Sequence, residues 1–389
     1  MKKLHPENLD LNQITGEFKR RAQYGLSLEK FCEWIDPSFK ALSPHKHIIQ
    51  HLEKVASGEI RRLCIEVPPA SGKSMLTSRL FPAWVFGRNP TLRVIEASYN
   101  ADLAQRFGRE VRNLLLEPNY QKIFTKTRVA RDSAAQDEWS TEKGGTYKAE
   151  GVGGGLIGYH AHIAIIDDPI KNWEEGMSPG HRELVWNWYT GTLLNRLLNY
   201  KDGPGAVIII MQRWHDDDLI GRLLKEEGDD WVRIKLPSLA QEDDPLGREV
   251  GEPLLPDWRS KEELLKIQAR NPAQFQALHQ QDPVPEEGDI FKQSDFKRFY
   301  SVPENLTYFG ASDYAVSEKR GDWTVHLISG VDQFGNLYIV DLWRDRTNSK
   351  VWVDQVISFI KKYEPLYWAE EQGQIIGGVG PFLSLKMQE

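Results

Sequence analysis

A short stretch at residues 67–76, VPPASGKSML, has the residue types of a phosphate-binding loop. It follows an apolar, β-prone run, RRLCIEV, and precedes MLTSRLFPAWVF, which can begin a helix. In a strand–loop–helix unit the unpaired amides of the first helical turn and a lysine ammonium attract an anion, and a serine hydroxyl can bind Mg²⁺. We therefore predict that a phosphate group contacts the loop residues Pro69, Ala70, Ser71, Gly72, Lys73 and Ser74.

The loop departs from the common nucleotide-loop pattern G-x-x-x-x-G-K-[ST], because Val67 stands where the first glycine is expected. Taken alone, the stretch could also be a surface turn that carries an isolated lysine. A second motif favours the phosphate site. Four apolar residues in IAIIDDP, residues 163–169, lead into Asp167 and Asp168. Carboxylates at the carboxyl edge of a buried strand can hold Mg²⁺ and orient an attacking water.

A third apolar run, VIIIMQ, places Gln212 and Arg213 at the end of another strand. A polar side chain at this edge can contact the γ-phosphate and transmit its loss. The alternative is a capped turn into the next helix.

Further carboxylates lie in the last third of the chain. Asp313 ends the run FGASD, and Glu370 and Glu371 end LYWAEE. The element order of this region is βββαβα, in which the first and fourth strands are neighbours. We therefore expect the carboxylates to converge, where they can hold two Mg²⁺ or Mn²⁺ ions for phosphodiester cleavage. Asp322, which opens the second strand, is a weaker candidate.

The elements that must position these residues alternate between strands and helices. Apolar runs near residues 61–67, 92–99, 162–168 and 205–212 are separated by amphipathic helices, which predicts a parallel sheet covered on both faces. After an acidic, proline-containing segment the order becomes βββαβα. We predict an α/β chain with a helical lead-in at 1–45, a first domain at 46–282, a linker at 283–304 and a second domain at 305–389.

Composition limits the class of protein. The chain has 389 residues and a net charge of −7, so any contact with nucleic acid must use local basic patches. Two cysteines, Cys32 and Cys64, form no disulfide framework and fit a reducing cytoplasm. The N-terminal residues lack the apolar core of a signal peptide, and we expect no membrane span.

Several strings together resemble the large terminase subunit of tailed bacteriophages. They extend from about residue 40 to the end of the chain and are EVPPASGKS, ASYNADLAQRFGREVRN, GVGGGLIG, IAIIDDPIKN, MQRWHDDDLIGRL, SDYAVSEKRGDWTVH, NLYIVDLWR and WAEEQGQI. The resemblance implies an ATPase domain of the additional-strand P-loop class. It also implies a ribonuclease H-like nuclease domain that cuts concatemeric DNA.

The resemblance also assigns roles by position. Lys73 and Ser74 match the nucleotide-loop lysine and the Mg²⁺ hydroxyl, and Asp167 and Asp168 match the Mg²⁺ carboxylate and the catalytic carboxylate. Gln212 lies in the segment that couples ATP hydrolysis to movement. For the nuclease, Asp313 and Glu371 match the metal-binding acids, with Glu370 as the reserve. The implied partners are double-stranded DNA, the portal protein of a procapsid, the small terminase subunit and further copies in a ring, in the cytoplasm of the host cell.

Three departures from the family pattern lead to further expectations. Ala70 stands where many members have an arginine, so we expect Arg106, Arg109 or Arg112 to act on the phosphates, in cis or from a neighbouring subunit. Asp168 is one methylene shorter than the glutamate common at its position. The chain also ends before the strand and the helix that carry a final aspartate. We therefore expect an incomplete nuclease domain with weak or no activity.

Three other functions would use some of these features. A P-loop translocase unrelated to packaging would lack the ribonuclease H-like region, and a mobile-element nuclease would not need the ATPase half. A non-catalytic prophage remnant would keep the fold without turnover.

Overall fold

The computed structural model describes residues 23–284, 296–314 and 323–370 of the chain. The chain divides into two compact units, Met1–Glu287 and Gly288–Glu389, and the division falls inside the predicted linker. None of the helices in these described ranges is long and apolar enough to cross a membrane.

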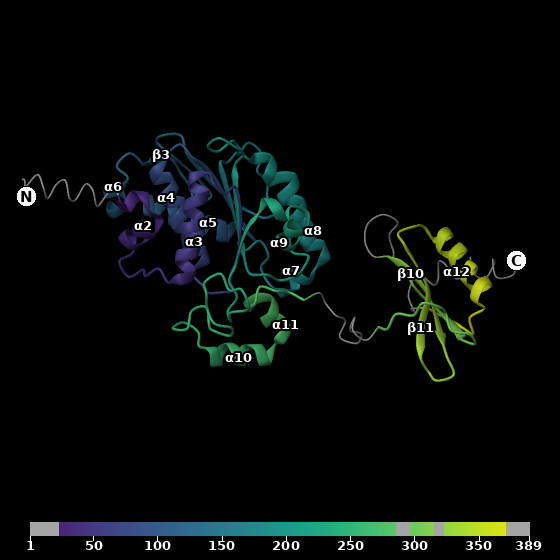
Figure 1. Ribbon diagram of the computed structural model, residues 1–389. Helices are drawn as coiled ribbons and strands as arrows, with labels where there is room; N and C mark the ends of the chain where they lie inside the picture. Colours follow the sequence, from purple (N-terminus) through teal and green to yellow (C-terminus); the bar gives the residue numbers. More distant parts are fainter. Residues whose placement is uncertain (1–22, 285–295, 315–322, 371–389) are drawn as a thin grey trace, which may run out of the picture. The chain divides into compact units, whose positions relative to one another are not determined.

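An eight-stranded sheet forms the centre of the first unit (Figure 1). Its strands are β1 (Arg62–Glu66), β2 (Arg93–Ser98), β3 (Val129–Ala134), β4 (Glu138–Thr141), β5 (Thr146–Gly151), β6 (Ile163–Asp167), β7 (Ala206–Met211) and β8 (Val232–Lys235). Their order is β3-β4-β5-β2-β6-β7-β1-β8. All neighbours from β5 to β8 are parallel, whereas β3, β4 and β5 pair antiparallel. The prediction of an α/β chain with a mainly parallel sheet is therefore confirmed.

The helices of the first unit lie around this sheet and in a lobe that follows β8. They are α2 (Leu28–Ile35), α3 (Ser43–Ser57), η2 (Met75–Leu80), α4 (Phe81–Arg88), α5 (Ala101–Leu116), α6 (Pro118–Ile123), α7 (Trp173–Met177), α8 (Pro179–Trp188), η3 (Tyr189–Leu193), η4 (Leu194–Arg196), α9 (Leu219–Glu226), η5 (Gly228–Asp230), α10 (Lys261–Arg270), α11 (Pro272–Gln274) and η6 (Phe275–His279). Helices α3, α4 and α5 lie on one face, and α8 and α9 lie on the other. The segment that follows β8 forms a small lobe, residues 236–281, with its own apolar cluster of Leu239, Leu264 and Phe275.

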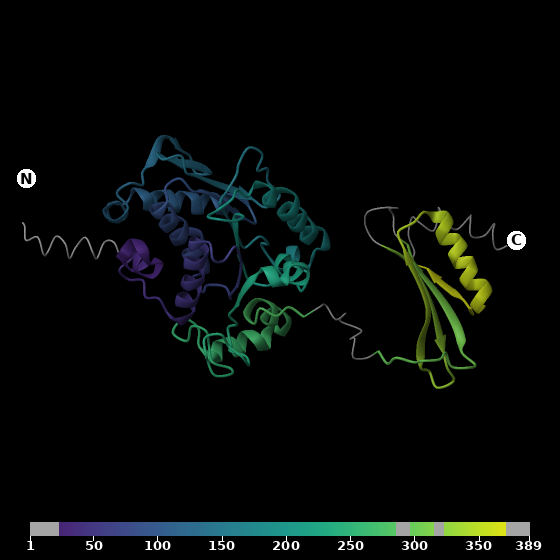
Figure 2. The same ribbon diagram turned by 45° about the horizontal axis from the view of Figure 1, so that its top comes forward.

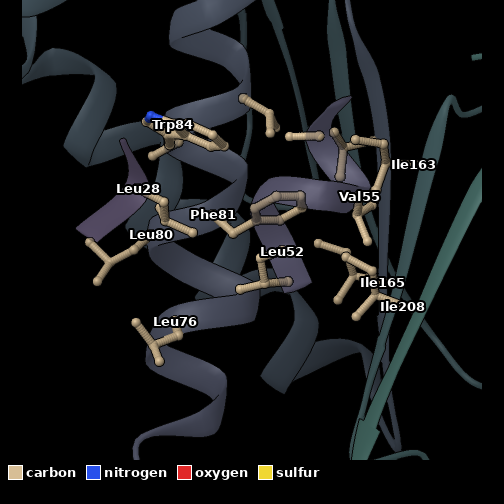
Figure 3. Packing of buried hydrophobic residues seen from close by; sticks show 14 of the residues in the cluster. Leu28, Leu52, Val55, Leu76, Leu80, Phe81, Trp84, Ile163, Ile165 and Ile208 are labelled. Carbon is tan, nitrogen blue, oxygen red and sulfur yellow. The ribbon is translucent and has the colours of Figure 1, made fainter. Parts of the chain in front are cut away.

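Both faces of the sheet are buried, which explains the continuous apolar strands. In β7, Ile208 and Ile210 join the cluster on the α3 side, while Ile209 and Met211 join the cluster on the α8 side. Figure 3 shows Phe81, among other helical side chains, facing the strand residues of the first cluster. Full burial of each such side chain contributes about 1.5–3 kcal/mol relative to exposure. Strand ends are thus fixed firmly enough to position polar groups.

The second unit contains a four-stranded sheet in the order β11-β10-β9-β12. Its elements are β9 (Thr307–Asp313), β10 (Thr324–Val331), β11 (Leu337–Asp345), α12 (Ser349–Tyr363) and β12 (Trp368–Glu370). Figure 2 shows α12 along one side of this sheet. The first and fourth strands are parallel neighbours, as expected from the element order. The final helix of the predicted βββαβα order falls outside the described residues.

The apolar runs predict four strands in the first unit, whereas the structure has eight. The apolar pattern does not predict strands β3, β4, β5 and β8, because these strands carry many polar and charged residues. The basic string KIFTKTRVAR, for example, contains the start of β3. Three of these strands lie beyond β2 at one end of the sheet and β8 lies at the other, and edge positions tolerate polar side chains. The helix that begins at Pro179 changes to π and 3₁₀ turns after Trp188.

Candidate active site

The loop between β1 and η2 has a backbone that curls around a cavity. Ala70 and Gly72 both adopt left-handed conformations, with φ of 60° and 77°. Glycine takes this conformation without strain, whereas alanine rarely does. The Ser71 hydroxyl donates to the Pro68 carbonyl over 2.8 Å and fixes the turn. A cavity of about 360 Å³ opens beside the loop and is lined by residues 69–75 together with Asp168 and Gln212.

Three strand ends bring their polar side chains to this cavity. The Lys73 ammonium lies 3.0 Å from Asp168 Oδ2 and donates to Gln212 Oε1 over 2.6 Å. Asp168 follows β6, and Gln212 follows β7, which is the neighbour of both β6 and β1. The lysine is only 6% exposed, so its charge is held by these two partners rather than by water. The residues predicted from the loop, IAIIDDP and VIIIMQ thus meet at one edge of the sheet.

Asp167 lies deeper than Asp168 and has hydroxyl partners. Its Oδ1 accepts from Ser74 Oγ over 3.0 Å, and its Oδ2 accepts from Ser78 Oγ over 2.6 Å. Burial, together with the nearby Asp168 charge, raises the pKa of Asp167 from 3.8 to about 7, although Lys73 opposes this. Because burial disfavours the charged form of the Asp167 carboxyl, a nearby cation would stabilise that carboxylate strongly.

The donor set fits a divalent cation in its chemistry. Ser74 and Asp167 offer a hydroxyl and a carboxylate oxygen side by side, and hard cations such as Mg²⁺ prefer oxygen ligands. Asp168 Oδ1 is buried and has no hydrogen-bond partner within the described ranges. An unsatisfied buried acceptor beside the loop is consistent with a partner that arrives with the ligand.

No sequence motif indicates His45, whose ring contacts the loop. The Leu42 amide donates to His45 Nδ1 over 3.3 Å, so the ring proton is on Nε2. Nε2 then donates to the Ser71 carbonyl over 3.1 Å. The ring is only 2% exposed, and burial lowers its pKa, which keeps it neutral. A Cβ at Gly72 would lie 3.3 Å from Nε2, so this position leaves little room for a larger residue.

A second, narrower pocket of about 120 Å³ also adjoins the loop. Residues 68–71 form one wall, and the lobe forms the other with Leu254, Leu255, Trp258 and Arg259. The indole of Trp258 is 54% exposed. This pocket shares Pro69, Ala70 and Ser71 with the larger cavity, so the two lie next to each other. No motif in the lobe sequence indicated it.

The side chain of Arg213 does not enter the cavity. Its guanidinium pairs with Asp218 at 2.9 Å and with Glu66 at 3.2 Å, and all three side chains are buried. The Arg213 amide instead donates to the side chain of Gln281 over 3.0 Å. The backbone that follows Gln212 is therefore tied to residue 281, shortly before the described part of the first unit ends.

The structure does not bring the proposed arginines to the phosphate cavity. Arg106 faces Glu110 across 3.9 Å, and Arg112 donates to the Ala135 carbonyl. Arg109 likewise is not among the residues that line the cavity, and no described lining residue is an arginine. The expectation that an arginine of α5 acts on the phosphates in cis is therefore wrong for this conformation, because these side chains do not line the cavity.

In the second unit, Asp313 is exposed at the end of β9. Glu370 pairs in register with Ser312, so the two acids lie on opposite faces of the sheet. Glu370 accepts from the Tyr314 hydroxyl over 2.6 Å instead. Glu371 and Asp322 lie outside the described residues. Within the described ranges no group of three or more His, Cys, Asp or Glu side chains is placed to hold a metal ion.

Comparisons with known proteins agree with the resemblance in the sequence. Residues 64–298 match the family described as terminase large subunit, T4likevirus-type, N-terminal. Among solved structures, the large terminase of a thermophilic bacteriophage in complex with ADP is 14% identical, with 86% of this chain and 79% of that chain covered and a TM-score of 0.37. The HK97 bacteriophage large terminase is 13% identical, with 94% and 77% covered and a TM-score of 0.45. Among curated proteins no sequence matches the chain.

Proposed function

The chain belongs to the large terminase family of bacteriophages, and from this premise we propose that it is an ATP-hydrolysing motor that drives double-stranded DNA into a procapsid. One observation supports the proposal most strongly. Lys73, Asp168 and Gln212 come from three different segments and meet in a single loop-lined cavity. The position of β7 between the loop strand β1 and the acidic strand β6 supports the additional-strand P-loop class.

Each cavity residue has a role in the proposed reaction. The loop amides and Lys73 hold the phosphates, and Lys73 leaves Asp168 and Gln212 when the γ-phosphate takes their place. Ser74 and Asp167 hold Mg²⁺, which when bound neutralises charge that develops on the phosphates. Asp168, released from Lys73, orients the attacking water and accepts its proton. The narrow pocket beside Trp258 takes the base of the nucleotide, and aromatic stacking there orients ATP.

Gln212 connects hydrolysis to movement in this proposal. Its amide senses whether a γ-phosphate is present, and the next residue is fixed to Gln281 through a buried hydrogen bond. A shift of Gln212 therefore displaces the segment that leads out of the first unit. DNA contacts that respond to this shift should be made to phosphates, and they should be salt-sensitive and largely independent of sequence.

The remaining assignments follow from the family alone. We propose that the second unit is a ribonuclease H-like nuclease in which Asp313 and Glu371 bind Mg²⁺ or Mn²⁺. We also propose that the chain works as a ring of copies with the portal protein and the small terminase subunit, in the cytoplasm of the host cell.

The Lys73→Ala variant tests the proposed ATPase site. The parent should release phosphate from ATP in a Mg²⁺-dependent reaction, and the variant should lose this activity while keeping its circular dichroism spectrum. Lys143→Ala is the matched control, because Lys143 is exposed in the turn between β4 and β5. Equal rates for parent and Lys73→Ala would show that the loop assignment is wrong. A parent that neither binds nor hydrolyses ATP would support a non-catalytic remnant instead.

A further inference from the structure

Two arginines and a tryptophan form an exposed platform on the second unit. The guanidinium carbons of Arg344 and Arg346 lie 4.2 Å and 4.3 Å from the ring centroid of Trp323. All three side chains are exposed. Neither guanidinium has a carboxylate partner within salt-bridge distance in the described part of the chain. Stacking on an aromatic ring holds an arginine in place while leaving its hydrogen-bond donors free.

Strand register places this platform in line with Asp313. Val325 of β10 is paired with Asp313 on one side and with Arg344 on the other. Residues directly opposite each other across a sheet project from the same face. Since neighbouring strands are about 4.8 Å apart, Asp313 and Arg344 are separated by about 10 Å along this row.

The row lies on the face of the sheet that α12 does not cover. The adjacent row contains Ser312, His326 and Trp343, which project from the opposite face. Tyr314, whose ring packs against His326, also packs against Trp352 of α12. The helix therefore covers the His326 face, and the row of Asp313, Val325 and Arg344 lies on the other. A ligand that reaches Asp313 on this face can reach the arginines as well.

We propose that Trp323, Arg344 and Arg346 bind the phosphate backbone of duplex DNA and position it across the sheet face that α12 does not cover, toward Asp313. The platform offers two fixed, unpaired positive charges, and a DNA strand offers regularly spaced negative ones. A chain with a net charge of −7 must bind DNA through such local sites. Contacts of this kind set the position of the duplex without reading its sequence. The proposal rests on the proposed nuclease role of the second unit, which it extends by naming a DNA-positioning surface.

The test measures binding of the full chain to a fluorescent 30-base-pair duplex by anisotropy at several salt concentrations. The Arg344→Ala/Arg346→Ala double variant should bind about tenfold more weakly at low salt. Its plot of log affinity against log salt should be shallower by about 2, because each phosphate contact contributes about 0.9 to the slope. The Arg344→Lys/Arg346→Lys variant should keep most of the slope, because it keeps both charges.

The control is Lys350→Ala/Lys361→Ala, which removes the same charge from exposed positions of α12 on the opposite side of the sheet. It should bind DNA like the parent. Unchanged affinity and slope in the arginine-to-alanine variant would overturn the proposal, and so would an equal loss in the α12 control. Either failure is distinguishable from failure of the nuclease proposal, because Mn²⁺-dependent cleavage of plasmid DNA by the parent is measured separately and does not enter the binding measurement. ATP hydrolysis without DNA should be the same in all of these variants.

Discussion

Asp167→Asn should stabilise the protein when divalent cations are absent, and it should do so more strongly at pH 8 than at pH 5.5. Asp167 is 1% exposed and lies beside a second carboxylate. Because burial raises its pKa from 3.8 to about 7, the folded protein holds this proton more tightly than the unfolded chain. Stability then falls as the pH rises from 3.8 to 7 and levels off above 7. Asparagine removes this pH-dependent cost and can still hydrogen-bond to both serines.

The expected size of the effect follows from the same pKa. The interval between pH 5.5 and the pKa covers about 1.5 pH units, which corresponds to about 2 kcal/mol. The difference in unfolding free energy between variant and parent should therefore shift by about 2 kcal/mol in favour of the variant from pH 5.5 to pH 8. Histidines that titrate over this range are common to both proteins and cancel in the difference.

Urea unfolding in the presence of EDTA, followed by tryptophan fluorescence at both pH values, measures this difference. Asp137→Asn serves as a control, because a hydrogen bond from Lys148 lowers the pKa of Asp137. That carboxyl is ionised in both folded and unfolded chains above pH 5.5, so its effect should not change with pH. If the difference between Asp167→Asn and its parent is the same at both pH values, the reasoning about Asp167 is refuted. Added Mg²⁺ and ATP should stabilise the parent more than the variant.

Two further substitutions test the surroundings of the loop. His45→Ala leaves the Ser71 carbonyl without its buried donor, so it should lower the free energy of unfolding by about 1–3 kcal/mol. It should also raise KM for ATP more than it lowers kcat. Urea unfolding and steady-state kinetics measure these effects, and an unchanged KM would contradict the supporting role of His45. Trp258→Ala should raise KM for ATP several-fold without changing KM for inorganic tripolyphosphate, and an equal effect on both substrates would show that the pocket does not hold the base.

The parts of the site that could be predicted from sequence are the polar residues that directly follow a buried, apolar strand. Runs such as IAIID and VIIIM are buried on both faces, so their parallel pairing is strongly favoured. The polar residues that follow such strands must then emerge at the same edge of the sheet. For this reason Asp167, Asp168 and Gln212 could be expected near Lys73 from spacing and pattern alone.

The remaining parts depend on packing between distant segments. His45 lies in the first turn of an ordinary amphipathic helix, and only the folded chain shows that its ring reaches the Ser71 carbonyl. Trp258 lies in a lobe that has no motif, yet it forms a wall of the pocket beside the loop. The side chains of Arg106, Arg109 and Arg112 could not be placed because a helix pattern gives the buried face but not the neighbours of the exposed one.

A crystal structure of the full chain with a non-hydrolysable ATP analogue and Mn²⁺, analysed by anomalous scattering, tests the central claim most directly. The account predicts one Mn²⁺ peak within about 2.5 Å of Ser74 Oγ and Asp167 Oδ1, with the γ-phosphate beside Lys73 and the base against Trp258. Phosphates bound elsewhere, or a phosphate-bound cation away from both Ser74 and Asp167, would contradict it. A separate Mn²⁺ peak at Asp313 would not, because that site is proposed to bind metal independently of the nucleotide.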